Sequence, residues 1–259
     1  MRLLCLNANT TPYVTDTVAD AMRAALGPAA DVVPCTPAFG PAIIKTRVDN
    51  AVAAHGVLDA AARHRDVDGV MLAVSFDTAL DALREALSVP VVGMTEASVA
   101  MARMLGGRIG YVSMGRAVAP LYAETLTHCA LERDLAGWES VEAPAAYRPG
   151  DKTAVDRLLA AAAGRLAEAG ADVVVLVGAV LAGAAARVQA ASAVPVIDGG
   201  AAGALTLRAM VDLAAPKPRV GRFALRPGGG LAGVSAALGA LQPPDALQPP
   251  GALPPPDAP

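Results

Sequence analysis

An internal repeat constrains the fold of this chain more than any other feature of its sequence. Residues 68–104, DGVMLAVSFDTALDALREALSVPVVGMTEASVAMARM, resemble residues 172–210, DVVVLVGAVLAGAAARVQAASAVPVIDGGAAGALTLRAM. When the two stretches are aligned at their first aspartate, Val74 falls opposite Gly178. A chain that contains the same plan twice is expected to fold into two lobes related by a pseudo-twofold axis.

The apolar residues form short runs between longer amphipathic segments. Parallel strands covered by helices on both faces are apolar at nearly every position, and amphipathic segments with a helical period indicate the covering helices. The sequence therefore predicts an α/β fold in which each lobe is a parallel sheet flanked by helices. The expected strands are residues 2–6, 70–74, 89–92, 109–112, 173–177 and 194–197, and the expected helices include residues 14–26, 79–87, 98–105, 154–169 and 202–213.

The repeat and the composition also predict how the chain is divided. Residues 1–95 are expected to form lobe I, completed by residues 199–222, and residues 96–198 to form lobe II. Residues 223–259 are rich in glycine and proline, so we expect a flexible tail that is extended and solvated from about Leu241. Ligands of open α/β sheets bind beyond the carboxyl ends of the strands, which places a small-molecule site in the cleft between the two lobes.

The composition argues against several classes of function. A net charge of -3 and an aromatic content of 3% do not suit nucleic-acid binding, which needs basic patches and stacking rings. Cys5, Cys35 and Cys129 are odd in number and form no C-x-x-C pair, so neither a disulfide framework nor a zinc site is expected. The chain shows no signal-peptide core and no membrane-spanning run, and we expect a cytoplasmic protein that binds neither metal nor membrane.

The loops after the expected strands carry polar side chains that can bind a ligand. Asn7, Asn9 and Thr10 follow the first strand, and Ser75 and Ser113 follow two later ones. Amide and hydroxyl groups at the start of a helix, together with the free backbone N–H groups there, attract carboxylates. We expect Asn7, Asn9, Thr10 and Ser113 to form an anion cradle, and Ser75 to be a further substrate-binding residue.

Three carboxylates that follow strands, Asp77, Glu96 and Asp198, are candidate proton-transfer groups. Burial raises the pKa of a carboxyl group toward values useful for acid–base catalysis. Each can instead cap a helix, and capping the helix at 79–87 is the favoured interpretation of Asp77. The three cysteines are expected to be buried structural thiols. The three histidines fall in helical stretches away from the strand ends, so no catalytic role is expected for them.

Several short motifs, taken in their order along the chain, resemble those of a known family. They are N-x-N-T at residues 7–10, PAFGP at 37–41, FDT at 76–78, PVVG at 90–93 and VIDG at 196–199. From Met1 to about Leu213, their order and spacing resemble the aspartate/glutamate racemase superfamily, and in particular its hydantoin racemase branch.

The resemblance implies two α/β lobes, no metal and no pyridoxal phosphate. It also implies that one cysteine removes a proton beside a carbonyl and a second cysteine returns it from the opposite face. At the positions that match these cysteines the chain has Val74 and Gly178, and a shift of one residue gives Ser75 and Ala179. None of these is an effective carbon base, because an unassisted serine hydroxyl is too weak an acid. Lys45 stands where the family usually has an acidic residue, and this cation can bind a second carboxylate.

These observations predict a cofactor-independent enzyme that acts on a small carboxylate or a cyclic imide or amide. Rather than a two-cysteine racemase, we expect a decarboxylase, another lyase, an isomerase or a cyclase that uses an oxyanion or carboxylate cradle. Two alternatives stay open: a non-catalytic binding or scaffold protein on the same fold, and a racemase with bases other than cysteine. The sequence also leaves a homo-oligomer open.

Overall fold

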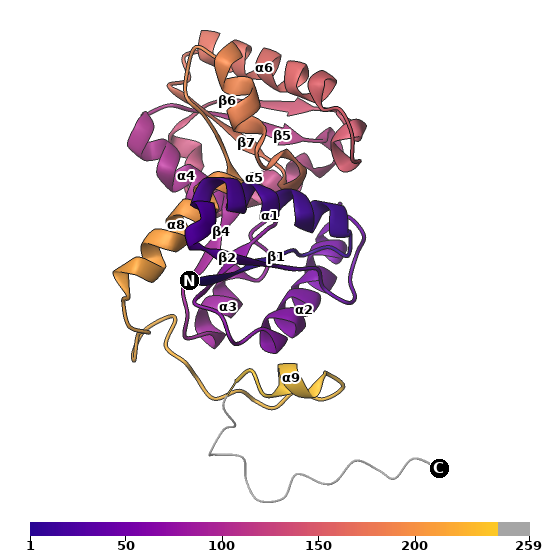
Figure 1. Ribbon diagram of the computed structural model, residues 1–259, viewed down its shortest axis with the longest axis vertical. Helices are drawn as coiled ribbons and strands as arrows, with labels where there is room; N and C mark the ends of the chain where they lie inside the picture. Colours follow the sequence, from indigo (N-terminus) through magenta and orange to yellow (C-terminus); the bar gives the residue numbers. More distant parts are fainter. Residues whose placement is uncertain (243–259) are drawn as a thin grey trace, which may run out of the picture.

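Two four-stranded parallel sheets form the centre of the protein, and each belongs to one lobe (Figure 1). The computed structural model describes residues 1–242. The strand orders are β2-β1-β3-β4 and β6-β5-β7-β8, so the second sheet repeats the plan of the first. The predicted α/β fold is confirmed. The strands are β1 (Arg2–Leu6), β2 (Asp31–Cys35), β3 (Gly69–Leu72), β4 (Val91–Gly93), β5 (Ile109–Met114), β6 (Leu135–Val141), β7 (Val173–Val177) and β8 (Val196–Asp198).

Helices follow most of the strands and cover both faces of each sheet. The α-helices are α1 (Pro12–Leu26), α2 (Arg47–Arg63), α3 (Leu80–Ala86), α4 (Met94–Leu105), α5 (Ala119–His128), α6 (Thr153–Glu168), α7 (Ala184–Val188), α8 (Gly199–Leu213) and α9 (Ala236–Gly239). Short 3₁₀ helices connect them at η1 (Gly27–Ala29), η2 (Arg116–Val118), η3 (Leu131–Arg133), η4 (Pro144–Tyr147), η5 (Ala179–Leu181) and η6 (Gln189–Ala191).

Strand β1 shows how the apolar runs divide between two cores. Leu4 and Leu6 pack with residues of α2 and α3, whereas Leu3 and Cys5 pack with residues of α1 and α8. Alternate residues of a strand point to opposite faces, so a continuous apolar run is required where helices cover both faces. The second sheet is built in the same way, with α6 and α7 over one face and α4 and α5 over the other.

Helices α4 and α8 join the two lobes. Helix α4 follows the first sheet along the chain but packs against β7 of the second, and α8 follows the second sheet but packs against β3 and β4 of the first. The two helices also contact each other. This exchange fixes the orientation of the two sheets, so their carboxyl ends face a common space.

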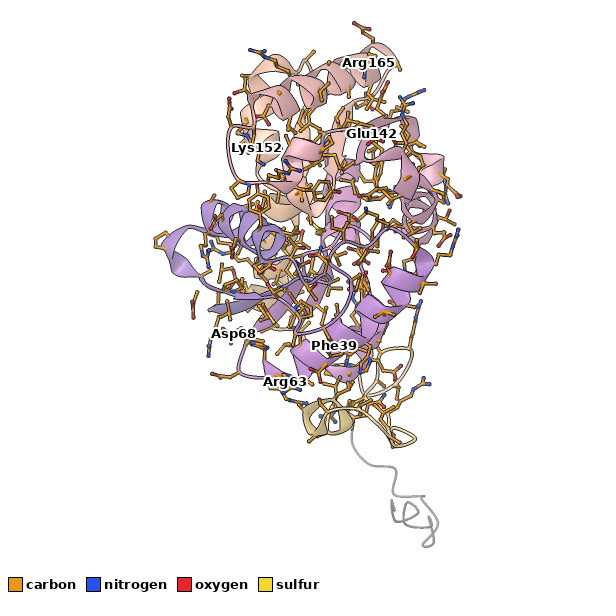
Figure 2. The ribbon with its side chains drawn as sticks, turned by 90° about the vertical axis from the view of Figure 1, so that its right-hand side faces the viewer. Phe39, Arg63, Asp68, Glu142, Lys152 and Arg165 are labelled. Carbon is orange, nitrogen blue, oxygen red and sulfur yellow. The ribbon has the colours of Figure 1, made fainter. Side chains whose placement is uncertain are left out.

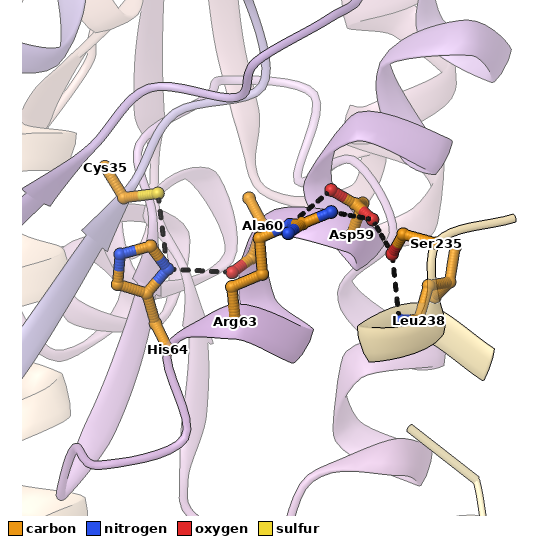
Figure 3. A network of polar contacts seen from close by, with 7 residues as sticks. All are labelled: Cys35, Asp59, Ala60, Arg63, His64, Ser235 and Leu238. Atoms are coloured by element: carbon orange, nitrogen blue, oxygen red, sulfur yellow. Dashed lines mark hydrogen bonds and ion pairs between the residues drawn. The ribbon is translucent and has the colours of Figure 1, made fainter. Parts of the chain in front are cut away.

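Residues 223–242, expected to belong to a flexible tail, dock on lobe I below α2 and α3 (Figure 1). Leu238 and Leu241 are buried in the same core cluster as residues of α2 and α3. The Ser235 hydroxyl accepts the N–H of Leu238 and donates to the carboxylate of Asp59, which Arg63 also binds (Figure 3). Two buried leucines and a buried carboxylate therefore hold this segment, and a free tail is wrong for it. The rest of the expected tail, residues 243–259, lies outside the described residues.

Across residues 1–242, no helix combines the length and the apolarity that crossing a membrane requires.

Candidate functional site

A cavity of about 570 Å³ lies between the lobes, beyond the carboxyl ends of the sheets. Its walls are largely apolar, and polar or charged side chains are few. Lobe I contributes Asn9, Val14, Ile43, Ile44, Lys45, Val74, Ser75 and Phe76. Lobe II contributes Met114, Gly115, Ala117, Val118, Tyr122, Glu142, Ala143, Pro144, Tyr147, Arg148, Gly178, Ala179 and Val180.

Val74 and Gly178, which the repeat places opposite each other, both line this cavity. Each begins a turn just after a central strand, β3 or β7. Gly178 has a φ of +147°, a conformation that residues with a Cβ rarely adopt. The backbone at this position therefore favours glycine independently of any chemical role.

Asn9 is the clearest donor that the first loop presents to the cavity. Its Oδ1 accepts the backbone N–H of Thr11 at 3.0 Å and the Nδ2 of Asn7 at 3.1 Å. In the described part of the chain, no acceptor binds the Nδ2 of Asn9, although the residue is only 8% exposed. Because Oδ1 is occupied on the protein side, Nδ2 is the group left to bind a ligand.

Asn7 and Thr10, two other members of the expected cradle, are not among the cavity-lining residues. The Oδ1 of Asn7 accepts the N–H groups of Ala8 and Asn9, and its Nδ2 donates to Thr15 Oγ1 at 2.9 Å. The Thr10 hydroxyl donates to the carbonyl of Pro41. Both side chains shape the loop that positions Asn9.

Ser113 is also turned away from the cavity. Strand β5 continues to Met114, two residues beyond the expected end. The Ser113 hydroxyl is fully buried, where it accepts from the indole N–H of Trp138 at 2.8 Å and contacts the Ser140 hydroxyl at 3.0 Å. Since these partners belong to the neighbouring strand β6, Ser113 stabilises the sheet rather than contacting a ligand.

Ser75 lies in the turn after β3 and lines the cavity. Its carbonyl accepts the hydroxyl of Thr95 at 2.7 Å, which fixes the turn to α4. Among residues 1–242, no acceptor binds the backbone N–H of Ser75 or Phe76. On the other side, Ala179 and Val180 begin η5, and the first N–H groups of a helix have no intrahelical acceptor. The two turns thus offer backbone donors at the cavity.

Asp77 caps a helix, but not the helix that the sequence indicated. Its two carboxylate oxygens accept the N–H groups of Thr95 and Glu96 at 3.1 and 2.8 Å, in the first turn of α4. A Cβ added to Gly93 would lie 2.4 Å from the Asp77 Cγ, so this close approach requires glycine. Burial raises the pKa of Asp77 to about 7, and the two backbone N–H groups oppose that rise. Asp77 does not line the 570 Å³ cavity.

Glu96 and Asp198 are held in other interactions. Glu96 forms a bidentate ion pair with Arg84 and lines a different cavity. Asp198 is 2% exposed and caps α8, accepting the N–H groups of Gly200 and Ala201 at 3.0 and 3.2 Å. Neither carboxylate lines the cavity between the lobes, so the geometry brings none of the three candidate carboxylates to it.

The three cysteines also lie away from this cavity. Burial raises the pKa of the Cys5 and Cys129 thiols to about 12, and it also raises the pKa of Cys35. The Cys35 Sγ lies 3.7 Å from Nδ1 of His64, but that nitrogen is 2.8 Å from the carbonyl of Ala60 (Figure 3). With Nδ1 donating to this carbonyl, His64 does not accept a proton from Cys35 through that atom.

Four polar side chains that line the cavity were not identified from the sequence: Tyr122, Glu142, Tyr147 and Arg148. Tyr122 stacks against Phe76 across the lobes, with ring centroids 4.8 Å apart. Burial raises the pKa of Tyr122 and of Tyr147 above the ordinary value, so both phenols stay protonated near neutral pH. Arg148 follows η4. The loop of Tyr147 and Arg148 follows β6, the equivalent of β2, and β6 has no continuous apolar run that could have marked this loop in the sequence.

No group of three or more His, Cys, Asp or Glu side chains is placed to hold a metal ion within the described residues.

Comparisons with known proteins agree with this architecture. Residues 3–207 match the family described as Asp/Glu/Hydantoin racemase. A hydantoin racemase from Paenarthrobacter aurescens is 29% identical over 205 residues, covering 76% of this chain and 86% of that protein. An allantoin racemase from Klebsiella pneumoniae has a similar structure, with a TM-score of 0.85, 28% identity, and coverage of 93% of this chain and 99% of that one.

Arylmalonate decarboxylase shares the fold, with a TM-score of 0.56, 21% identity, and coverage of 93% of this chain and 97% of that one. The match over residues 3–207 spans both sheets and the loops that line the cavity. This chain therefore belongs to the Asp/Glu/hydantoin racemase family.

Proposed function

We propose that this protein is a cofactor-independent enzyme that acts on a small carboxylate or a cyclic imide or amide without a cysteine pair. The observation that carries this proposal is the cavity in which Val74 and Gly178 stand together while all three cysteines lie elsewhere. The cavity lies at the strand ends of both lobes, as a small-molecule site of such a fold requires.

The substrate class is supported by the relatives and by the donors. Hydantoin and allantoin racemases, at 29% and 28% identity, are named for cyclic ureides. A ring of this kind carries carbonyl oxygens that become negatively charged when a proton or a carboxylate group leaves the adjacent carbon. The Asn9 amide and the backbone N–H groups of Ser75 and Phe76 are free to bind such an oxygen.

The chemistry we propose is stabilisation of a developing enolate by these donors. Preorganised donors in a cavity that excludes water stabilise such an anion by several kcal/mol. Decarboxylation fits these groups best, because the bond to the departing carboxylate supplies the electron pair of the enolate and the protein then adds one proton; elimination, isomerisation and ring closure also need a group that accepts a proton. Tyr122 lines the cavity and stays protonated, because burial raises its pKa. We assign it the role of proton donor rather than base.

A second candidate is a binding protein without catalytic activity. It is favoured by the positions of Asp77, Glu96 and Asp198, which all bind other parts of the protein instead of lining the cavity. A racemase with bases other than cysteine is the remaining alternative. It would need a proton acceptor on each face of the substrate, whereas the tyrosines of the cavity are held in their protonated form.

The test is turnover in deuterated water, followed by NMR, with 5-benzylhydantoin, allantoin, phenylmalonate, aspartate and glutamate. We expect product from at least one compound and no thiol-dependent deuterium exchange into recovered substrate. Because Cys5 and Cys35 are buried, alkylation is combined with single Cys→Ala variants at residues 5, 35 and 129. Exchange that these variants abolish would contradict the proposal. Binding of a compound without turnover would favour the second candidate.

A further inference from the structure

Two cations stand at the cavity on loops that are equivalent in the two lobes. Lys45 lies between β2 and α2, and Arg148 lies between β6 and α6. Strands β2 and β6 occupy the same place in their sheets, each beside the first strand of its lobe. Both residues line the cavity and both are exposed, so they belong to its open rim.

Hydrogen bonds hold the backbone of Lys45 and of Arg148, and these bonds do not involve the charged groups of the two side chains. The N–H of Lys45 donates to the carboxylate of Asp49 at 3.0 Å, within the capping box of α2. The carbonyl of Arg148 accepts a hydrogen bond from the ammonium group of Lys152. Lys152 is labelled in Figure 2, together with Glu142 of the same lobe. The two loops are therefore held by backbone hydrogen bonds, which leave the charged groups of Lys45 and Arg148 available to a ligand.

Neither charge is paired within residues 1–242. No carboxylate lies within ion-pair distance of Lys45 or Arg148, whereas nearby Arg47 binds Glu124. Glu142 is the one carboxylate that lines the cavity in this part of the chain, and its Oε1 accepts the backbone N–H of Arg116 at 2.7 Å. Two cations and one carboxylate leave a net charge of +1 on the lining.

The inner walls of the cavity are apolar, so an anionic group of a ligand would bind at the charged rim rather than deep in the cavity. Ile43, Ile44 and Val180 line the cavity together with Val74, and a charge buried against such groups without a partner is costly. The volume of about 570 Å³ lies in the range of roughly 300–1,000 Å³ that encloses larger organic ligands. A bare five-membered ring would leave much of this space empty.

We infer that Lys45 and Arg148 together bind an anionic group at the far end of the substrate, beyond an apolar body that fills the cavity. This inference rests on the proposed function, because it assumes that the reacting head lies at Val74 and Gly178. The substrate class is then narrowed to molecules with a ring or carboxylate head, an apolar middle and a distal carboxylate. The same anion would join the two lobes across the cavity.

The experiment compares two probes that differ only in the distal charge, 5-benzylhydantoin and 5-(4-carboxybenzyl)hydantoin. Isothermal titration calorimetry with the full chain at low salt gives the ratio of their dissociation constants. We expect the carboxylated probe to bind roughly tenfold more tightly, since two exposed charge contacts each add a modest factor. In Lys45→Met or Arg148→Met the ratio falls about threefold, and in the double variant it falls to about one.

Matched controls separate this effect from a change of fold. Arg157→Met removes an exposed cation of α6 that does not line the cavity and should leave the ratio unchanged, whereas Lys45→Arg should preserve it. The preference should also weaken in high salt, which screens exposed charges.

The outcomes distinguish the inference from the function on which it rests. Equal binding of both probes by the unmodified protein overturns the inference and leaves the proposed function standing. A preference that survives the double variant also overturns it. Binding of neither probe contradicts both proposals. A charge-dependent preference, with no turnover of either probe or of any compound of the turnover series, supports binding of the distal anion by the two cations and contradicts the proposed enzyme.

Discussion

The carbonyl oxygens of Val74 and Gly178 each accept the N–H of the third residue ahead, so turns with the same hydrogen bond stand on two sides of one cavity. The distances are 3.2 Å to the Asp77 nitrogen and 2.8 Å to the Leu181 nitrogen. The internal repeat of the sequence thus places equivalent turns on the two sides of the cavity. The two turns differ in how they are anchored: the carboxylate of Asp77 fixes the first to helix α4, and no carboxylate within residues 1–242 does the same for the second.

Gly178→Ala should lower the free energy of unfolding by about 1–3 kcal/mol, because a φ of +147° is strained for a residue with a Cβ. Gly164→Ala is the matched control. Gly164 lies within α6 and a Cβ there meets nothing within 4 Å, so alanine should stabilise the helix by about 0.5–1 kcal/mol. Urea unfolding measures both, and equal effects would show that residue 178 tolerates a side chain. Gly178→Cys should be as costly as Gly178→Ala.

Asp77→Asn should change how stability depends on pH. Burial raises the pKa of Asp77 from 3.8 to about 7, so the folded protein binds more protons than the unfolded chain between these values. Its stability contribution is therefore greatest at low pH and falls as the pH rises toward 7. Asparagine does not titrate, so the unfolding free energy of the parent minus that of the variant should decrease from pH 4 to pH 7. Parallel urea-unfolding profiles across this range would contradict the assignment.

Asn9→Asp should weaken binding of 5-(4-carboxybenzyl)hydantoin. The variant keeps the oxygen that accepts the N–H of Thr11 but replaces the free Nδ2 donor with a second acceptor. Loss of one hydrogen bond to a charged ligand costs about 1.5–3 kcal/mol, or roughly ten- to hundredfold in affinity. The control is Ser113→Ala, which should lower stability by about 1 kcal/mol without changing affinity. Calorimetry that showed the reverse order of affinities would restore Ser113 to the cradle and remove Asn9.

Leu238→Ala should lower the free energy of unfolding by about 2–5 kcal/mol, the cost of emptying a well-packed leucine site. Leu238 is 4% exposed and belongs to the core cluster of lobe I, whereas Leu225 is 51% exposed. Leu225→Ala should therefore be nearly neutral. A chain that ends at Gln242 keeps Leu238 and Leu241 and is expected to melt within a few degrees of the full chain. A neutral Leu238→Ala would show that the docked segment contributes nothing to stability.

The architecture of this protein could be predicted from its sequence. Each apolar run of four or five residues has to be covered on both faces, and the repeat requires the same arrangement twice. Strand β1 was predicted with the bounds that the structure has, Arg2–Leu6. The edge strand β6 was not, because Leu135–Val141 is only partly buried along most of its length and mixes polar with apolar residues.

Which polar groups reach the cavity depends on the tertiary fold. Two further residues of strand β5 direct Ser113 to Trp138, since successive strand residues face opposite sides. Asp77 caps a helix that begins 17 residues further along the chain, where it binds the N–H of Thr95. Lys45 and Arg148 line the same cavity from loops more than a hundred residues apart. Local patterns fix strands and helices because those depend on neighbouring residues. The direction of a side chain at a strand end depends on partners that are distant in sequence, and these contacts exist only in the folded chain.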